Sequence, residues 1–287
     1  MSHTFARHRL FSAPRRSFLP RMGFAALTLA AVLATGASAG GDCEAQPPAS
    51  PVAAAAVAAR VTVPAALAPV APAAVAPAAD LLDATLDRLA SNAPGLKRDV
   101  LRLALAARDA AAHEGLARKD ELLTVIDYSL PSTAKRLWVF DLESGKVLFN
   151  ELVAHGKNTG DNYARSFSNK DGSLQTSLGL FRTAGTYVGG NGYSLKLSGL
   201  EPGFNDKAER RAVVMHGAPY VSADFAAQHG RIGRSWGCPA LSQQVAGKVI
   251  DTIKGGSLVF SYFPDQEWLH HSRFVGSLAA TLTTGTH

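Results

Sequence analysis

Cysteine is scarce in this sequence, and that scarcity excludes two ways of holding a fold together. The 287 residues include only Cys43 and Cys238. We expect both thiols to be free, or nearly so, which leaves no disulfide framework. No set of cysteines and histidines has the spacing of a zinc site, and the neighbouring His270 and His271 are only a weak sign of a metal.

Positive charge is also scarce once the first residues are set aside. The formal net charge is +6, but residues 1–39 contain five arginines and no acidic residue, which leaves +1 for the rest of the chain. A nearly neutral protein lacks the basic surface that nucleic-acid binding requires. We therefore expect no nucleic-acid partner.

Long hydrophobic runs are absent as well. The apolar stretch from Met22 to Thr35 is too short for an ordinary membrane-spanning helix. It follows a basic segment and precedes Ala37-Ser38-Ala39, a cleavage site of small residues. This pattern predicts a signal peptide over residues 1–39. We expect an exported protein of the periplasm or cell envelope, with no stable membrane span after cleavage.

Two export routes fit this segment. Arg15-Arg16-Ser17-Phe18-Leu19 matches the core of a twin-arginine signal, although extra arginines also suit the general secretory route. A lipid attached to Cys43 is disfavoured, because Gly40-Gly41-Asp42 lacks the apolar residue that precedes such a cysteine.

The chain then changes character three times. Residues 40–79 are rich in alanine and proline, which predicts a disordered linker. Residues 80–119 place leucines at helical spacing, with Asp80 as a candidate N-cap and Pro94-Gly95 between two helices. Residues 120–265 alternate with a period of two and contain hairpin turns such as Glu143-Ser144-Gly145. This favours a mainly β domain, followed by a tail over residues 266–287 that we expect to be poorly packed.

A histidine and a cysteine, each beside a glycine, are the candidate chemical groups. The apolar run Ala212–Met215 predicts a buried strand that ends in a turn at His216-Gly217. Cys238 lies in a later loop, after Gly237. A thiolate nucleophile needs a base and donors for the oxyanion that forms when it attacks a carbonyl. The pattern indicates a cysteine acyl-transfer site, although a lone cysteine is more often a small buried residue.

Two neighbouring features bear on this site. His155, in the glycine-bounded loop 155–160, is a second candidate base, but a structural hydrogen bond explains it equally well. After the cysteine, Leu241, Val245, Val249 and Ile253 predict a helix with Ser242 as its N-cap. The N-terminus of that helix would help to lower the pKa of the Cys238 thiol.

The sequence motif around the cysteine is specific enough to indicate a family. His216-Gly217 followed by Gly233-Arg234-Ser235-Trp236-Gly237-Cys238-Pro239-Ala240 resembles the murein L,D-transpeptidase catalytic-domain family, the YkuD-like enzymes. Trp236 stands where the common motif has a second histidine, as in a sub-branch with this Gly-Arg-Ser-Trp-Gly-Cys-Pro-Ala sequence. The resemblance covers roughly residues 120–265.

The resemblance implies a β-sandwich-like fold and acyl transfer on peptidoglycan stem peptides, without a metal or organic cofactor. It implies Cys238 as nucleophile and His216 as base. Oxyanion or substrate contacts would come from Gly237, Ser235, Arg234 and Gly217, with Arg234 suited to a substrate carboxylate. We expect a monomer. Three alternatives stay open: an L,D-carboxypeptidase, another envelope cysteine peptidase, and a non-catalytic wall-binding module.

Overall fold

The computed structural model describes residues 78–118 and 121–279. These residues belong to one compact unit, Val70–His287. The predicted signal peptide, its cleavage site, the linker and Cys43 lie outside the described residues. None of the helices in the described ranges is long and apolar enough to cross a membrane.

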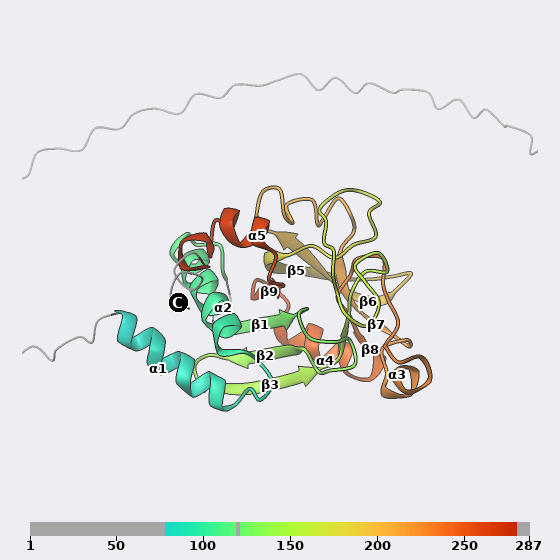
Figure 1. Cartoon of the computed structure of the whole chain (residues 1–287), viewed down its shortest axis with the longest axis horizontal. Coiled ribbons are helices and arrows are strands. Elements are labelled where there is room, and N and C mark those ends of the chain that lie inside the picture. The colour runs from blue at the N-terminus through green and yellow to red at the C-terminus, as the bar shows by residue number, and fades with distance from the viewer. Residues whose placement is uncertain (1–77, 119–120, 280–287) are drawn as a thin grey trace, which may run out of the picture. The chain divides into compact units, whose positions relative to one another are not determined.

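A nine-stranded sheet organises this unit, with five helices around it (Figure 1). The mainly β class predicted from the sequence is confirmed. The strand order is β3-β2-β1-β9-β5-β6-β7-β8-β4. The strands are β1 Leu122–Asp127, β2 Leu137–Asp141, β3 Lys146–Glu151, β4 Val153–Ala154, β5 Gly179–Gly189, β6 Gly192–Gly199, β7 Val214–Ala218, β8 Ala240–Ser242 and β9 Leu258–Tyr262. The helices are α1 Ala78–Ser91, α2 Arg98–His113, α3 Ala223–His229, α4 Gln243–Ile253 and α5 Gln266–His271.

The sheet curls back on itself because its two outermost strands are one stretch of chain. β3 pairs with β2 at one end of the order, and β4 pairs with β8 at the other. Only Leu152 separates β3 from β4. A single extended segment therefore joins both edges, which makes the sheet barrel-like where we expected a sandwich, and covers edges that would otherwise stay open.

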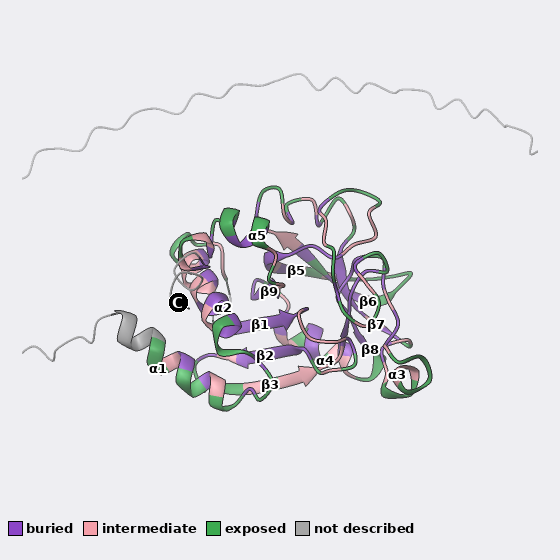
Figure 2. Ribbon diagram, viewed as in Figure 1, coloured by how far each residue is buried: buried purple, intermediate pink, exposed green. Residues whose placement is uncertain are grey.

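The two faces of the sheet bury two different cores, as the alternation of side chains along a strand requires. In β1, Leu123 and Val125 face a core shared with α1, α2 and α5, whereas Ile126 faces the other core. That second core includes Val249 and Ile250 of α4. Figure 2 shows β1 buried along its whole length, β2 buried except at its last residue, and β3 only partly buried.

The two predicted N-terminal helices are confirmed, with one error. The break falls between α1 and α2, as Pro94-Gly95 indicated. Asp80 lies inside α1, which begins at Ala78, so it is not the N-cap. Buried leucines such as Leu86 and Leu101 join the same core as the sheet strands β1 and β9. The helical pair is thus packed on the sheet.

The prediction of a poorly packed tail was wrong. α5 and the residues after it pack against the sheet, with Trp268 fully buried and Val275 also in the core. The Trp268 indole donates to the buried carboxylate of Glu201 at 3.0 Å. Short helices with few apolar residues give little periodic signal, so this packing became visible only in three dimensions.

The strand that carries the histidine differs from its prediction. β7 begins at Val214 and continues through His216 to Ala218, so His216 lies within the strand rather than at a turn. Ala212 precedes the strand with a φ of 52°. β5 and β6 form a hairpin that turns at Gly190-Asn191. Ser242 caps α4 through the Gln244 amide, as predicted.

Candidate active site

Strand pairing brings the cysteine beside the histidine strand. β7 and β8 are parallel, with His216 opposite Ala240. Two residues earlier in both segments, Cys238 lies beside Val214, whose amide donates to Sγ at 3.4 Å. The thiol donates in turn to the carbonyl of Ala212 at 3.7 Å. Residues distant in sequence therefore meet because two short strands align.

Cys238 and His216 open into one cavity of about 350 Å³, which we call the thiol cavity. Its walls include an exposed aromatic residue, Trp236, and two arginines, Arg211 and Arg234. Cys238 is a free thiol with 9% of its surface exposed. A cavity with a thiol, an imidazole and cations along its walls suits a reaction that develops negative charge.

His216 is held as a neutral base. Its Nδ1 lies 3.0 Å from the carbonyl of Gly217, which can only accept, so Nδ1 carries the proton. The lone pair then resides on Nε2. Burial lowers the pKa of His216, against the opposing effect of the Gly217 carbonyl. The role of Gly217 is therefore to orient the imidazole, and its backbone packs against α4, where an added Cβ would meet Ala246 at 3.1 Å.

Opposing influences set the pKa of the Cys238 thiol. Burial raises it above the ordinary value, while the Val214 amide and the positive charge of Arg211 lower it. α4 begins at Gln243 with Ser242 as its N-cap, as the sequence predicted, and the short strand β8 lies between Cys238 and that helix. The positive charge that lowers the pKa of the Cys238 thiol is therefore that of Arg211.

The sequence did not single out Arg211. Its guanidinium donates to the carbonyls of Ser168 at 2.7 Å and Gln175 at 2.6 Å, and to the Ser173 hydroxyl at 3.1 Å. A Cβ placed on Gly237 would lie 3.5 Å from its Nη2, so the guanidinium borders the cysteine loop. Arg210, its neighbour, points to Asp171 at the surface. No local rule separates the two arginines, because loop contacts alone decide which one turns inward.

Ser235 and Gly237 shape the cysteine loop. The Ser235 hydroxyl donates to the carbonyl of Cys238 at 2.6 Å and accepts from the Gly237 amide at 3.1 Å. Gly237 has a φ of +123°, a conformation that favours glycine, and a Cβ there would meet the Gln175 carbonyl at 2.8 Å. Because its amide already has an acceptor, Gly237 does not offer a free oxyanion donor, contrary to the expectation.

Arg234 is occupied by the neighbouring loop. Its guanidinium donates to Asp161 at 2.8 Å and to the carbonyls of Gly160 at 3.0 Å and Lys157 at 3.2 Å. These contacts fasten the 157–161 loop to the cysteine loop. All three hydrogen bonds come from Nη1, and Arg234 also lines the thiol cavity, so its contact with a substrate carboxylate stays a prediction beside this structural role.

His155 is a structural residue. Its Nδ1 lies 2.8 Å from the guanidinium of the buried Arg136, and its Nε2 lies 3.3 Å from the carbonyl of Gly160. Arginine can only donate, so Nδ1 accepts and Nε2 carries the proton. Burial and the Arg136 charge lower the pKa of His155 from 6.5 to about 4. Its backbone carbonyl accepts from the Ser235 amide at 2.9 Å, so His155 supports the cysteine loop from behind.

Trp236 stands at the mouth of the thiol cavity with 76% of its surface exposed. The ammonium of Lys157 lies 5.9 Å from the centre of its six- and five-membered ring system. Within the described ranges, no group of three or more histidine, cysteine, aspartate or glutamate side chains is placed to hold a metal ion.

The fold and the site together define a cysteine-containing β domain in which a histidine and the thiol line one cavity, and comparison with known proteins assigns its family. Residues 92–262 match the L,D-transpeptidase catalytic domain family. The chain belongs to this family, which acts on peptidoglycan, and the match supports an L,D-transpeptidase-like function. No curated protein is a significant match.

Solved structures give weaker likenesses. An L,D-transpeptidase from Mycobacterium smegmatis is 17% identical with a TM-score of 0.32, covering 50% of this chain and 59% of its own. One from Stackebrandtia nassauensis is 16% identical with a TM-score of 0.31, covering 64% and 90%. The helical cell shape determining protein from Campylobacter jejuni is 17% identical with a TM-score of 0.34, covering 64% and 63%. The chain spans about three fifths of the mycobacterial structures.

Proposed function

We propose that this protein is a peptidoglycan L,D-transpeptidase that works through a thioester on Cys238, in the periplasm or cell envelope. The observation that carries the proposal is the shared cavity of Cys238 and His216, with His216 Nδ1 donating to Gly217 so that Nε2 is free to accept a proton. A neutral imidazole and a thiol in one cavity are the minimum that cysteine acyl transfer needs.

In the first half-reaction, His216 Nε2 takes the thiol proton and Sγ attacks the carbonyl carbon between the third-position diamino acid and the terminal D-amino acid. A carbon–sulfur bond forms, and the oxyanion is stabilised by the Cys238 amide. His216 then gives its proton to the leaving nitrogen as the carbon–nitrogen bond breaks. Arg211 lowers the energy of the thiolate state through its charge.

In the second half-reaction, an amine of a second stem peptide attacks the thioester and a 3→3 cross-link forms. The amine proton passes through His216 to the departing sulfur, which restores the thiol. Water as acceptor would give an L,D-carboxypeptidase, and a protein lysine would give an anchoring reaction. The acceptor distinguishes these outcomes, whereas the acylation step is common to all of them.

Mass spectrometry of purified stem peptides incubated with the full chain tests the proposal. We expect a thioester adduct on the peptide containing Cys238, release of the D-amino acid, and a cross-linked dimer. Cys238→Ala should abolish all three while circular dichroism shows an unchanged fold, because the loop loses only a thiol. Turnover that survives in the folded alanine variant would refute the assignment.

A non-catalytic wall-binding domain is the second candidate, because Cys238 is largely buried and burial raises the pKa of its thiol. Alkylation with iodoacetamide separates the two. A nucleophile reacts quickly below the pKa of an ordinary thiol, whereas a core cysteine reacts slowly at every pH. Slow alkylation across the pH range, without a thioester adduct, would favour the binding domain.

A further inference from the structure

Trp236 is the one exposed tryptophan among the three in the chain. Trp138 and Trp268 lie in the core with 1% and 0% of their surfaces exposed, whereas Trp236 exposes 76%. An indole is a large apolar group, and its contact with water forgoes the stabilisation that burial would give. The fold therefore gains little from Trp236, which points to a role at the surface.

The backbone on both sides of Trp236 is fixed. The Ser235 amide donates to the carbonyl of His155 at 2.9 Å, and the Ser235 carbonyl accepts from the Lys157 amide at 2.8 Å. After the tryptophan, the Gly237 amide donates to the Ser235 hydroxyl at 3.1 Å. Because the loop is already ordered, a ligand that packs on the indole does not have to order it.

The same loop holds the indole at the mouth of the thiol cavity, which Trp236 lines together with Cys238. Two residues of chain span at most about 7 Å, so the tryptophan side chain starts within that distance of the nucleophile. The Lys157 ammonium lies over the ring, 5.9 Å from its centre. Since most of the indole is exposed, its opposite face is open to a ligand.

The proposed reaction brings a sugar to the mouth of this cavity. Sγ of Cys238 attacks the carbonyl of the third stem residue, and the first stem residue is joined to the glycan strand. Three extended residues span roughly 10 Å, a distance that the chain from Cys238 to Trp236 and the indole together also cover. A pyranose ring presents a face of C–H groups, which the negative face of an aromatic ring attracts.

We infer that Trp236 is a platform for a sugar ring of the glycan strand that carries the donor stem peptide. The inference rests on the proposed function. While the stem carbonyl lies at Cys238, a hexosamine ring packs on the open face of the indole. Trp236 thereby positions the donor and favours stems that are attached to glycan over free peptides.

Two donors that differ only in their sugars test the inference. One is a disaccharide tetrapeptide, and the other is the same tetrapeptide without sugars. The preference for glycan is the ratio of their kcat/KM values, measured as release of the D-amino acid. Trp236→Ala should lower this preference about tenfold, mainly through KM, because the sugar contact is the same before and during the reaction. Trp236→Phe should retain part of the preference, since it keeps an aromatic face.

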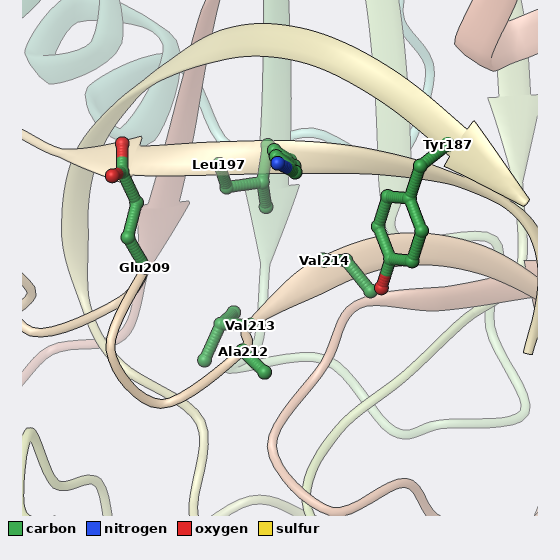
Figure 3. A pocket seen from close by; sticks show the side chains of 7 residues that line it. Tyr187, Leu197, Glu209, Ala212, Val213 and Val214 are labelled. Atoms are coloured by element: carbon green, nitrogen blue, oxygen red, sulfur yellow. The ribbon is translucent and has the colours of Figure 1, made fainter. Parts of the chain in front are cut away.

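Tyr187→Ala is the matched control. The Tyr187 ring is also partly exposed and lies 5.7 Å from a lysine ammonium, that of Lys196. It lines a different cavity, beside Val214 and Leu197 (Figure 3), and is not part of the wall of the thiol cavity. The preference for the disaccharide donor should therefore be unchanged in Tyr187→Ala.

Three outcomes would overturn the inference: no preference for the disaccharide donor in the unaltered chain, an unchanged preference in Trp236→Ala, or equal losses for both donors. If the unaltered chain forms no thioester, the proposed function fails. Calorimetry on the Cys238→Ala chain then decides the platform alone. The disaccharide tetrapeptide should bind about tenfold more weakly after Trp236→Ala, and equal binding, or none to either chain, refutes the site.

Discussion

At Cys238, the pKa of the thiol reflects a balance between burial, which raises it, and two favourable contacts, which lower it. The Val214 amide is part of the backbone, so every substitution of that side chain except proline leaves it in place. Arg211 is a side chain, and its guanidinium is fixed by several hydrogen bonds to loop residues. The electrostatic contribution of this arginine is therefore open to a direct experiment.

Arg211→Gln should move the pH profile of Cys238 alkylation to higher pH, since a nearby cation favours the thiolate. Arg211→Lys keeps the charge without the planar set of donors, so its profile should lie between those of the other two proteins. Arg210→Gln is the matched control, because that side chain is exposed and pairs with Asp171. An unchanged pH profile in a folded Arg211→Gln protein would show that Arg211 does not stabilise the thiolate.

Substitution of His216 and of His155 should affect alkylation of Cys238 differently. His216→Gln should slow alkylation of Cys238 near neutral pH and shift its dependence upward, because the base beside the thiol is lost. His155→Gln should leave that profile alone, since both ring nitrogens of His155 are engaged away from the thiol cavity. Iodoacetamide kinetics across pH 5–9 measure both, and the reverse result would transfer the role of base to His155.

At the scale of elements, the C-terminal segment is joined to the sheet by a buried carboxylate. Glu201 accepts from the Leu180 amide of β5 at 2.7 Å and from the Trp268 indole of α5. Burial raises the pKa of Glu201, while hydrogen bonds to Ser272, Leu180 and Trp268 oppose the rise. One side chain thus links a strand, a loop and α5.

Trp268→Ala should lower the free energy of unfolding by about 3–5 kcal/mol, since it leaves a large cavity in the core and removes a donor from Glu201. Trp236→Ala should change it by less than about 0.5 kcal/mol, because that indole is largely exposed. Urea denaturation of both variants compares the two tryptophans. A small effect at Trp268 would show that α5 packs more loosely than the structure indicates.

At the scale of the whole molecule, export remains a prediction, because residues 1–39 lie outside the described residues. Replacing Arg15 and Arg16 by lysines keeps the charge and removes the guanidinium pair. If the pair is read as a twin-arginine address, export of a reporter fused after Ala39 should drop sharply. Unchanged export would assign the protein to the general secretory route, which requires only a basic segment.

The sequence by itself determined the parts of the fold whose signals are local. The signals of the apolar strand over residues 122–127, the turn at Glu143-Ser144-Gly145 and the four-residue spacing after Leu241 each depend on neighbours in the chain. The sequence motif around Cys238 likewise indicated the family that the later comparison showed. Such features can be predicted from the sequence because the residues that produce them are close together in the chain.

Only the tertiary structure decided which polar groups face the thiol. Arg211 is held by the carbonyl of Gln175 and Arg234 by the carboxylate of Asp161, and both partners come from loops far away along the chain. The Gly237 amide is taken by Ser235, and His155 is neutralised by burial beside Arg136, which no periodicity reveals. Electrostatics and hydrogen bonding depend on distance in space, so these roles were fixed when the sheet curled and brought its loops together.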